Sequence, residues 1–258
     1  MRTAIKLIKM RPTAPTHYPQ KGFTLVESAI VLVLIGLLIG GILRGQELIA
    51  SARVRNVIDQ VRAVQVAYYG FQDRYSALAG DLTAAQAALI NANAAPALLV
   101  AGDGWVPIGD SQQFFNNISQ AGFLSCSQCM TKQTSSSNPT ANFSPTNLFG
   151  QPLGFAFPSN VPTTNALGTY YLSTQANEGS KAMVTTGGAI DSKALAEIDR
   201  KIDDGNPTFG QFRFSDQIPT INGTLVSPPF ANCVDSDAIS AYVWKVDGPG
   251  QCQGVLLL

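Results

Sequence analysis

The chain has 258 residues, a length that suits one medium-sized domain or two small ones with accessory segments. Its content of 45% hydrophobic and 13% charged residues is typical of a folded protein and excludes a chain that is disordered throughout. The 17 basic and 17 acidic residues balance, but five basic and no acidic residues lie in residues 1–22, so residues 23–258 are net acidic. This acidity argues against a nucleic-acid partner held mainly by charge.

The only histidine, His17, lies in the basic leader of residues 1–22. If the leader is removed, the remaining chain has no histidine, which excludes catalytic triads and metal sites that depend on one. The sequence also contains no nucleophile elbow, no Ser-x-x-Lys pair and no phosphate-binding loop. We therefore expect a protein that is not an enzyme.

Residues 23–43 form an apolar segment with a single ionisable side chain, Glu27. In a helix, at about 1.5 Å per residue, this segment is long enough to cross a hydrocarbon core of roughly 30 Å. The basic leader favours the cytoplasm, so residues after Arg44 are expected on the far side of the membrane. A carboxylate at membrane depth is costly, so we expect Glu27 to have a partner or a function. The alternative is that Glu27 lies near the interface and snorkels to the headgroups.

An ordinary secretory signal is cleaved after its apolar region, behind small residues, and no such pattern is evident between Ile42 and Ser51. The other candidate boundary lies before the apolar region. There, K-G-F-T-L-V-E-S at residues 21–28, followed by the apolar run, closely resembles the N-terminal signal of type IV pilins and type II secretion pseudopilins. The resemblance is close over residues 21–80 and weaker beyond them.

This resemblance implies that a prepilin peptidase cuts between Gly22 and Phe23 and methylates the new N-terminal amine of Phe23. It also implies that Glu27 pairs with the N-terminal amine of a neighbouring subunit when a filament assembles. The amine that Glu27 would meet exists only after cleavage.

A helical pattern continues beyond the apolar segment. Apolar residues recur at spacings of three and four between Val54 and Tyr75, which places them on one face of a helix. Because no proline lies between Phe23 and Ala79, we predict one helix over residues 23–79, with an apolar first half and an amphipathic second half that Gly80-Asp81 closes.

Four arginines follow the apolar segment and suggest contact with DNA or anionic lipid. We interpret them instead as a solvated face or as partners for acidic groups on neighbouring subunits. Four spread arginines on an acidic chain give only a weak electrostatic signal for nucleic-acid binding. They are Arg44, Arg53, Arg55 and Arg62.

We expect four parts in the chain: a removed leader (1–22), the apolar half-helix (23–43), the amphipathic half-helix (44–80) and a head (81–258). In the head, one or two helices are expected in 83–99, a turn in 101–105, a surface loop with brief strands in 131–165, and a helix in 191–207. Strands are expected in 168–173, 182–186, 209–214, 241–246 and 254–258. This order predicts an α+β fold in which an antiparallel sheet with inserted short helices packs on the amphipathic half-helix, as in the pilin fold.

All four cysteines lie on the side expected to be outside the cytoplasm, where disulfides form, and three pairings are open. We favour Cys126 with Cys129 and Cys233 with Cys252, and the second pair resembles the C-terminal disulfide loop of many type IV pilins. The alternative for Cys126-x-x-Cys129 is a thioredoxin-like redox pair, which the flanking residues do not support because no helix start follows a strand. A zinc site would need further ligands.

Two acidic clusters are candidate calcium ligands, because calcium takes oxygen ligands from such loops and some pseudopilins bind it near their C-terminal end. The alternative is a solvated acidic surface, and no other cofactor is expected. The candidate residues are Asp199, Asp203, Asp204, Asp235 and Asp237.

The resulting hypothesis is a structural subunit of a type IV pilus or a type II secretion pseudopilus. The large head and the absence of proline from the helix favour a minor pilin or pseudopilin. Its expected partners are prepilin peptidase, other pilin or pseudopilin subunits and the inner membrane, and the assembled subunit would lie in a periplasmic or cell-surface filament. The alternative is a signal-anchored periplasmic binding protein or enzyme that uses residues 23–43 only as an anchor.

Overall fold

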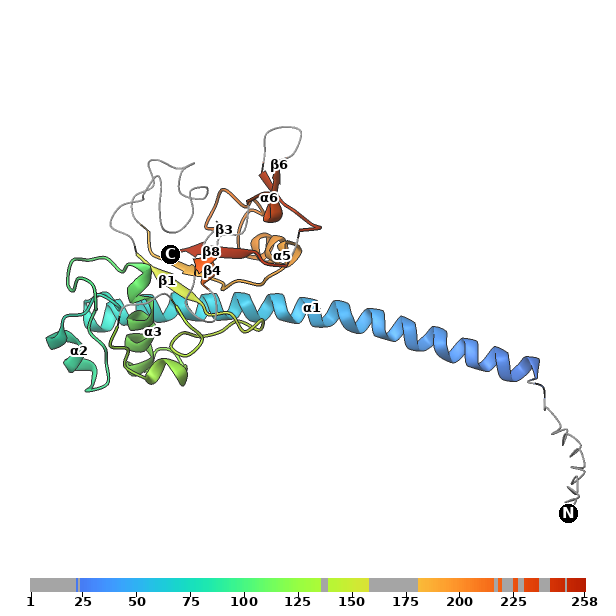
Figure 1. The fold of residues 1–258 in the computed structure, drawn as a ribbon, viewed down its shortest axis with the longest axis horizontal. Coiled ribbons are helices and arrows are strands. Elements are labelled where there is room, and N and C mark those ends of the chain that lie inside the picture. Colours follow the sequence, from blue (N-terminus) through green and yellow to red (C-terminus); the bar gives the residue numbers. More distant parts are fainter. Residues whose placement is uncertain are drawn as a thin grey trace, which may run out of the picture. The chain divides into compact units, whose positions relative to one another are not determined.

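The computed structural model describes residues 22, 24–135, 139–157, 181–215, 218–219, 225–226, 230–236, 242–248 and 250–258. Its contacts divide the chain into two units, residues 1–47 and 48–258. The helices are α1 (Leu25–Tyr75), α2 (Ala84–Ile90), α3 (Ser111–Gln120), α5 (Ser192–Ile202) and α6 (Phe230–Cys233), with 3-10 turns η1 (Ile108–Asp110) and η2 (Gln128–Met130) (Figure 1). The strands are β1 (Gly154–Ala156), β2 (Met183–Thr185), β3 (Phe212–Ser215), β4 (Ile218–Pro219), β5 (Leu225–Val226), β6 (Val234–Ser236), β7 (Tyr242–Trp244) and β8 (Gln253–Leu257).

Helix α1 is long because no proline interrupts it, and its second half is amphipathic as predicted. Its charged residues Arg55 and Asp59 are exposed on the face opposite the core. The buried face consists of apolar side chains at helical spacing: Val54, Val57, Ile58, Val61, Val64, Ala67, Tyr68 and Phe71. These side chains belong to the main hydrophobic core of the unit 48–258.

The end of α1 differs from the prediction. The helix ends at Tyr75, where Ser76 adopts a left-handed conformation with φ of 48°. The prediction that Gly80-Asp81 closes the helix is therefore wrong. Gly80 has φ of 88°, and a Cβ added there would lie 3.1 Å from the Cβ of Phe114, so glycine permits a close approach to α3.

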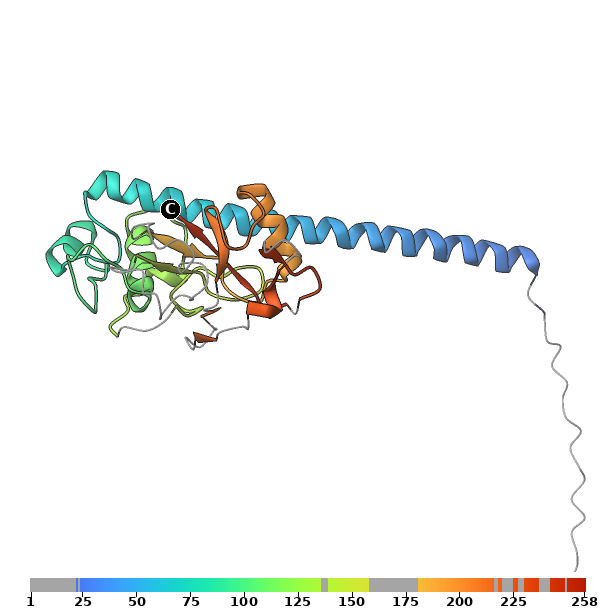
Figure 2. The ribbon, with the colours of Figure 1, turned by 90° about the horizontal axis from the view of Figure 1, so that it is seen from above.

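A four-stranded antiparallel sheet with the order β1-β2-β8-β3 forms the centre of the head. Because alternate strand residues point to opposite faces, Val184 and Leu256 join the main core with α1, whereas their neighbours Met183 and Leu257 form a smaller cluster. Figure 2 shows the sheet beside the cyan part of α1. The predicted α+β fold, with a long N-terminal helix and an antiparallel sheet, is confirmed, and hairpins β4–β5 and β6–β7 add to it.

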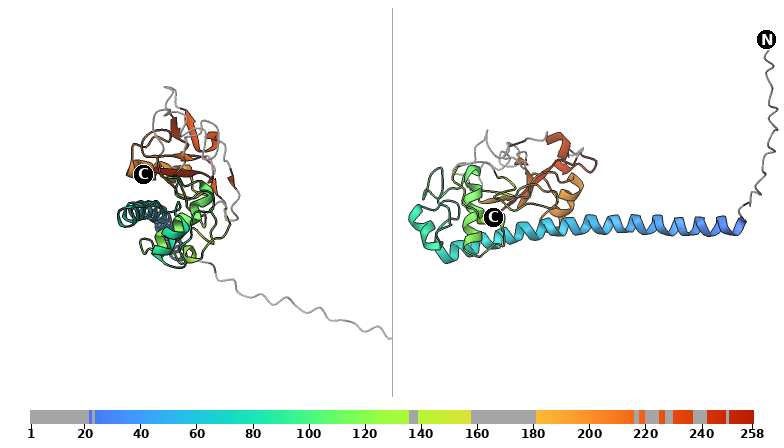
Figure 3. Two further views of the ribbon diagram at one scale, coloured as in Figure 1. Left: turned by 90° about the vertical axis from the view of Figure 1, so that its left-hand side faces the viewer. Right: turned by 60° about the horizontal axis from the view of Figure 1, so that its bottom comes forward.

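Helix α3 was not expected from the sequence, because S-Q-Q-F-F-N-N-I-S-Q has no continuous apolar stripe. Residues 111–119 are all buried, since α3 packs against η2, α2 and β1. In the right-hand view of Figure 3, the green α3 lies between the teal segment that holds α2 and the strands of the sheet. Its apolar contribution includes Phe114, which stacks on Phe155 of β1 with ring centroids 3.5 Å apart. A helix surrounded on all sides does not need one hydrophobic face.

The buried amides of α3 bind main-chain atoms of neighbouring segments. Asn116 accepts a hydrogen bond from the N–H of Ala95 (2.8 Å) and donates one to the carbonyl of Cys129 (2.9 Å). Asn117 accepts one from the N–H of Gly80 (2.8 Å) and donates one to the carbonyl of Ala95 (2.7 Å). These four bonds satisfy polar groups that would otherwise be unpaired in the core.

Other expectations are met in part. The segment 83–99 forms only the short α2, which begins with a capping box between Thr83 and Gln86. The segment 131–165 contains a brief strand, β1, as predicted, but the predicted surface position is wrong for part of its described residues, because Asn147 and Phe155 are buried. Helix α5 and strands β2, β3, β7 and β8 lie at predicted positions. The strand predicted at 168–173 lies outside the described residues.

Candidate processing and assembly site

The predicted cleavage junction lies immediately before α1. Gly22 is exposed, and a Cβ added to it would meet no atom within 4 Å. The leader up to residue 21 and Phe23 lie outside the described residues, and Thr24 directly precedes the first helical residue, Leu25. Within the described residues, the glycine side of the junction is therefore open to solvent.

Thr24 and Glu27 form a reciprocal set of hydrogen bonds at the start of α1. The N–H and the hydroxyl of Thr24 both donate to Oε2 of Glu27, at 2.9 and 3.0 Å. In return, the N–H of Glu27 donates to the Thr24 hydroxyl at 3.2 Å. This is the geometry of a capping box, in which two of the unpaired N–H groups of a helix start are satisfied together.

The role of Thr24 is not among the sequence predictions, although its signal is present in the motif. T-L-V-E, residues 24–27, has the Thr-x-x-Glu spacing of a capping box and stands just before an apolar run. The motif was interpreted through Glu27 alone. The structure adds that the carboxylate already has a partner within its own chain.

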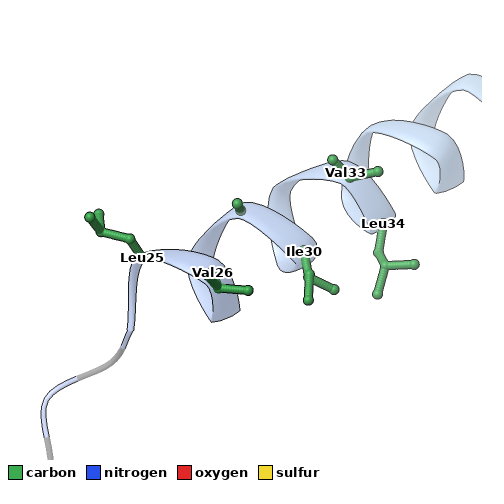
Figure 4. A pocket seen from close by; sticks show the side chains of 6 residues that line it. Leu25, Val26, Ile30, Val33 and Leu34 are labelled. Carbon is green, nitrogen blue, oxygen red and sulfur yellow. The ribbon is translucent and has the colours of Figure 1, made fainter.

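The first part of α1 exposes apolar side chains on all sides. The exposed fraction is 91% for Leu25 and 70% for Leu32, and an apolar groove runs along Leu25, Val26, Ala29, Ile30, Val33 and Leu34. Figure 4 shows five of these side chains projecting outward from the helix. By length and composition, α1 is the one helix in the described part of the chain that could cross a membrane. An apolar surface of this extent is unfavourable in water and needs lipid or another protein around it.

Two of the four arginines contact groups of the chain itself. Arg44 pairs with Glu47 across 3.0 Å, with both side chains exposed. The Arg53 guanidinium lies 5.7 Å from the ring centroid of Phe149, within the range of a cation–π contact. The exposed ion pair between Arg44 and Glu47 contributes little to the stability of the chain.

Both disulfides that we favoured are present in the head. Cys126 is joined to Cys129, the middle residue of η2, with Cα atoms 5.3 Å apart. Cys233, at the end of α6, is joined to Cys252, next to the start of β8, with Cα atoms 5.8 Å apart. The second bond ties the β6–β7 hairpin to the central sheet, because Cys233 leads directly into β6.

Three of the five calcium candidates lie together at the end of α5. One carboxylate oxygen each from Asp199, Asp203 and Asp204 can be chosen so that all lie within 4.8 Å of one another. Asp235 lies in β6, apart from this group, and Asp237 lies outside the described residues. The clustered carboxylates accept hydrogen bonds from backbone N–H groups, as when Asp203 accepts one from Phe212 (2.9 Å).

Comparison with known proteins bears on the N-terminal region. Residues 18–43 match the family described as the prokaryotic N-terminal methylation motif. No curated protein and no solved structure matches the chain significantly. The matched residues include the Gly22–Phe23 junction, the capping box and the apolar start of α1, which together fit a membrane-anchored precursor. The chain therefore carries the N-terminal methylation motif that is the hallmark of type IV pilin and pseudopilin precursors, the substrates of prepilin peptidase.

Proposed function

We propose that this chain is a structural subunit of a pilin-like filament, either a minor pilin of a type IV pilus or a pseudopilin of a type II secretion system. The observation that carries the proposal is the methylation motif at residues 18–43, placed at the start of a helix that exposes only apolar side chains over most of its first half. The subunit acts by assembly and not by catalysis. Its partners are prepilin peptidase and other pilin-like subunits.

The proposed sequence of events begins with cleavage between Gly22 and Phe23 and methylation of the Phe23 amine. Residues 23–43 then hold the subunit in the inner membrane, with the head in the periplasm, where disulfides are stable. Assembly exchanges lipid contacts for contacts between apolar helices, and Glu27 meets the amine of a neighbouring subunit. A buried charge pair of this kind specifies geometry more than it adds net stability.

The mature N-terminus is the direct test of this proposal. The full-length chain is produced with and without prepilin peptidase, and the N-terminal peptide is analysed by mass spectrometry. We expect a chain that begins at N-methylated Phe23 only when the peptidase is present. The matched control is Gly22→Val, which fills the open position at the junction and should leave the leader attached.

The alternative, a periplasmic binding protein or enzyme with a simple membrane anchor, predicts other products. An intact Met1 in the presence of the peptidase, or a cut beyond Leu43, would support the anchor and contradict the filament subunit. Filaments sheared from cells and probed for the head by immunoblotting give the second readout, because an anchored enzyme would remain in the membrane fraction.

A further inference from the structure

The capping box uses only one oxygen of the Glu27 carboxylate. Both Thr24 donors bind Oε2, and Oε1 accepts no hydrogen bond from any residue in the described part of the chain. Glu27 is exposed, so Oε1 is open to a group from outside the subunit. One carboxylate is therefore held by its own chain and still offers an acceptor.

The surroundings leave Thr24 as the main group able to hold this carboxylate. Between residues 24 and 43, the polar side chains are Thr24, Glu27 and Ser28. The hydroxyl and N–H of Ser28 both donate to the carbonyl of Thr24, at 3.4 and 3.2 Å, and not to Glu27. In an apolar environment an N–H group or a carboxylate without a hydrogen-bond partner is unfavourable. We therefore expect the capping box between Thr24 and Glu27 to persist in such an environment.

Cleavage of the leader does not remove any atom of the box. The Thr24 N–H belongs to the peptide bond with Phe23, and both hydroxyl and carboxylate lie on the mature side of the Gly22–Phe23 junction. The mature subunit therefore retains the same donors and acceptor.

We propose that Thr24 is a positioning residue for assembly: it holds Glu27 through Oε2 and presents Oε1 to the N-terminal amine of the next subunit. This inference rests on the proposed function. A free glutamate side chain loses rotamer freedom when it binds a partner, and the capping box removes that freedom beforehand. The hydroxyl of Thr24 thus acts through Glu27 and makes no contact with the incoming subunit.

Variants of Thr24 that separate capping from shape test the proposal in cells that express the full-length chain, prepilin peptidase and the filament machinery. Thr24→Val has the shape of threonine without the hydroxyl, whereas Thr24→Ser is smaller but keeps it. Cleavage and membrane insertion are measured first, and the fraction of mature subunit in sheared filaments is then compared. We expect Thr24→Ser to assemble like the wild type and Thr24→Val to assemble about tenfold less.

Two further variants give readouts that a merely structural role would not change. Thr24→Asn restores a strong capping side chain of different shape and should recover assembly. Thr24→Val added to Glu27→Ala should cause no further loss, because the two residues act as one unit.

Wild-type assembly by Thr24→Val, or an additional loss in the double variant, would overturn the role of Thr24 while leaving the filament function intact. A wild-type chain that is cleaved but never enters filaments would instead overturn the proposed function, and this inference with it.

Discussion

The indole Nε1 of Trp244 donates a hydrogen bond of 2.7 Å to Oδ2 of Asp199 and so joins β7 to α5. Oδ1 of Asp199 accepts a second bond from the N–H of Gly205 at 3.1 Å. Burial is the main cause that raises the pKa of this carboxyl, the two donors lower it, and the neighbouring carboxylates Asp204 and Asp203 raise it, with a net pKa of about 7. The pKa of Asp199 thus lies well above its ordinary value of 3.8.

The stability of the chain should therefore fall as the pH rises toward neutrality. Between about pH 4 and about pH 7, native Asp199 keeps a proton that the unfolded chain releases, so the native state binds more protons. The free energy of unfolding then decreases with pH, by up to about 1.4 kcal/mol per pH unit from this group. Urea unfolding of the full chain in detergent, followed by tryptophan fluorescence between pH 4 and pH 9, measures the slope.

Asp199→Asn isolates this group, because the amide retains an oxygen for Trp244 but does not titrate. We expect a shallower slope and not a flat one, because burial also raises the pKa of Asp110. Glu197→Gln is the matched control on the same helix, where Glu197 forms an exposed pair with Lys201. An unchanged slope for Asp199→Asn would contradict the assignment.

The two disulfides should differ in their contribution to stability. Cys233–Cys252 closes a loop with a sequence separation of 19, whereas Cys126–Cys129 spans 3. In the chain-entropy model, the longer loop contributes about 3 kcal/mol and the shorter one about 2 kcal/mol. We expect the Cys233→Ser/Cys252→Ser variant to unfold at lower urea concentration than the Cys126→Ser/Cys129→Ser variant. The reverse order would show that packing around η2 outweighs loop entropy.

Gly80 and Gly104 offer a matched pair for separating backbone strain from steric overlap. Both have left-handed backbones, with φ of 88° and 85°, but an added Cβ at Gly80 would meet Val106 and Phe114, whereas at Gly104 it meets nothing. Gly104→Ala should therefore cost only the backbone term of about 1 kcal/mol. Gly80→Ala should cost a further 1–3 kcal/mol, roughly, because the core must shift. Equal midpoints in urea unfolding would argue against tight packing between Gly80 and α3.

Removal of the Glu27 carboxylate should affect assembly and not processing. Glu27→Ala keeps the Gly22–Phe23 junction but loses the acceptor for the neighbouring amine, so we expect normal cleavage and at least about a tenfold fall in filament incorporation. Glu47→Gln is a suitable control, because Glu47 is an exposed acidic residue on the same helix. Wild-type incorporation of Glu27→Ala would show that the charge is dispensable.

The long helix was predictable because its information is local: periodic apolar residues, no proline and an uninterrupted apolar run. The exact end of the helix was not predictable. Glycine often ends a helix, but Gly80 instead allows a close contact with α3. The local signal could not reveal that Ser76 would take the left-handed conformation instead.

Helix α3 could not be predicted from the spacing of apolar residues, for a different reason. Its Asn and Gln side chains indicate a surface segment when read alone, and only tertiary contacts make them core residues. By contrast, T-L-V-E at residues 24–27 has the local spacing of a capping box, so the contact between Thr24 and Glu27 was predictable from the sequence. Of the candidate site, the junction and the carboxylate were predictable, and the hydroxyl that holds the carboxylate was overlooked.

Four buried polar side chains of the head bind the main chain. Asn116 and Asn117 bind backbone atoms, Asp81 accepts from the N–H groups of Gly102 and Gly104, and Asp110 accepts from those of residues 98 and 99. The bonds use backbone atoms, although Gly80, Gly102 and Gly104 have positive φ angles that favour glycine. At loop positions without such a φ angle, the outward side chains can therefore change while these bonds preserve the course of the loops.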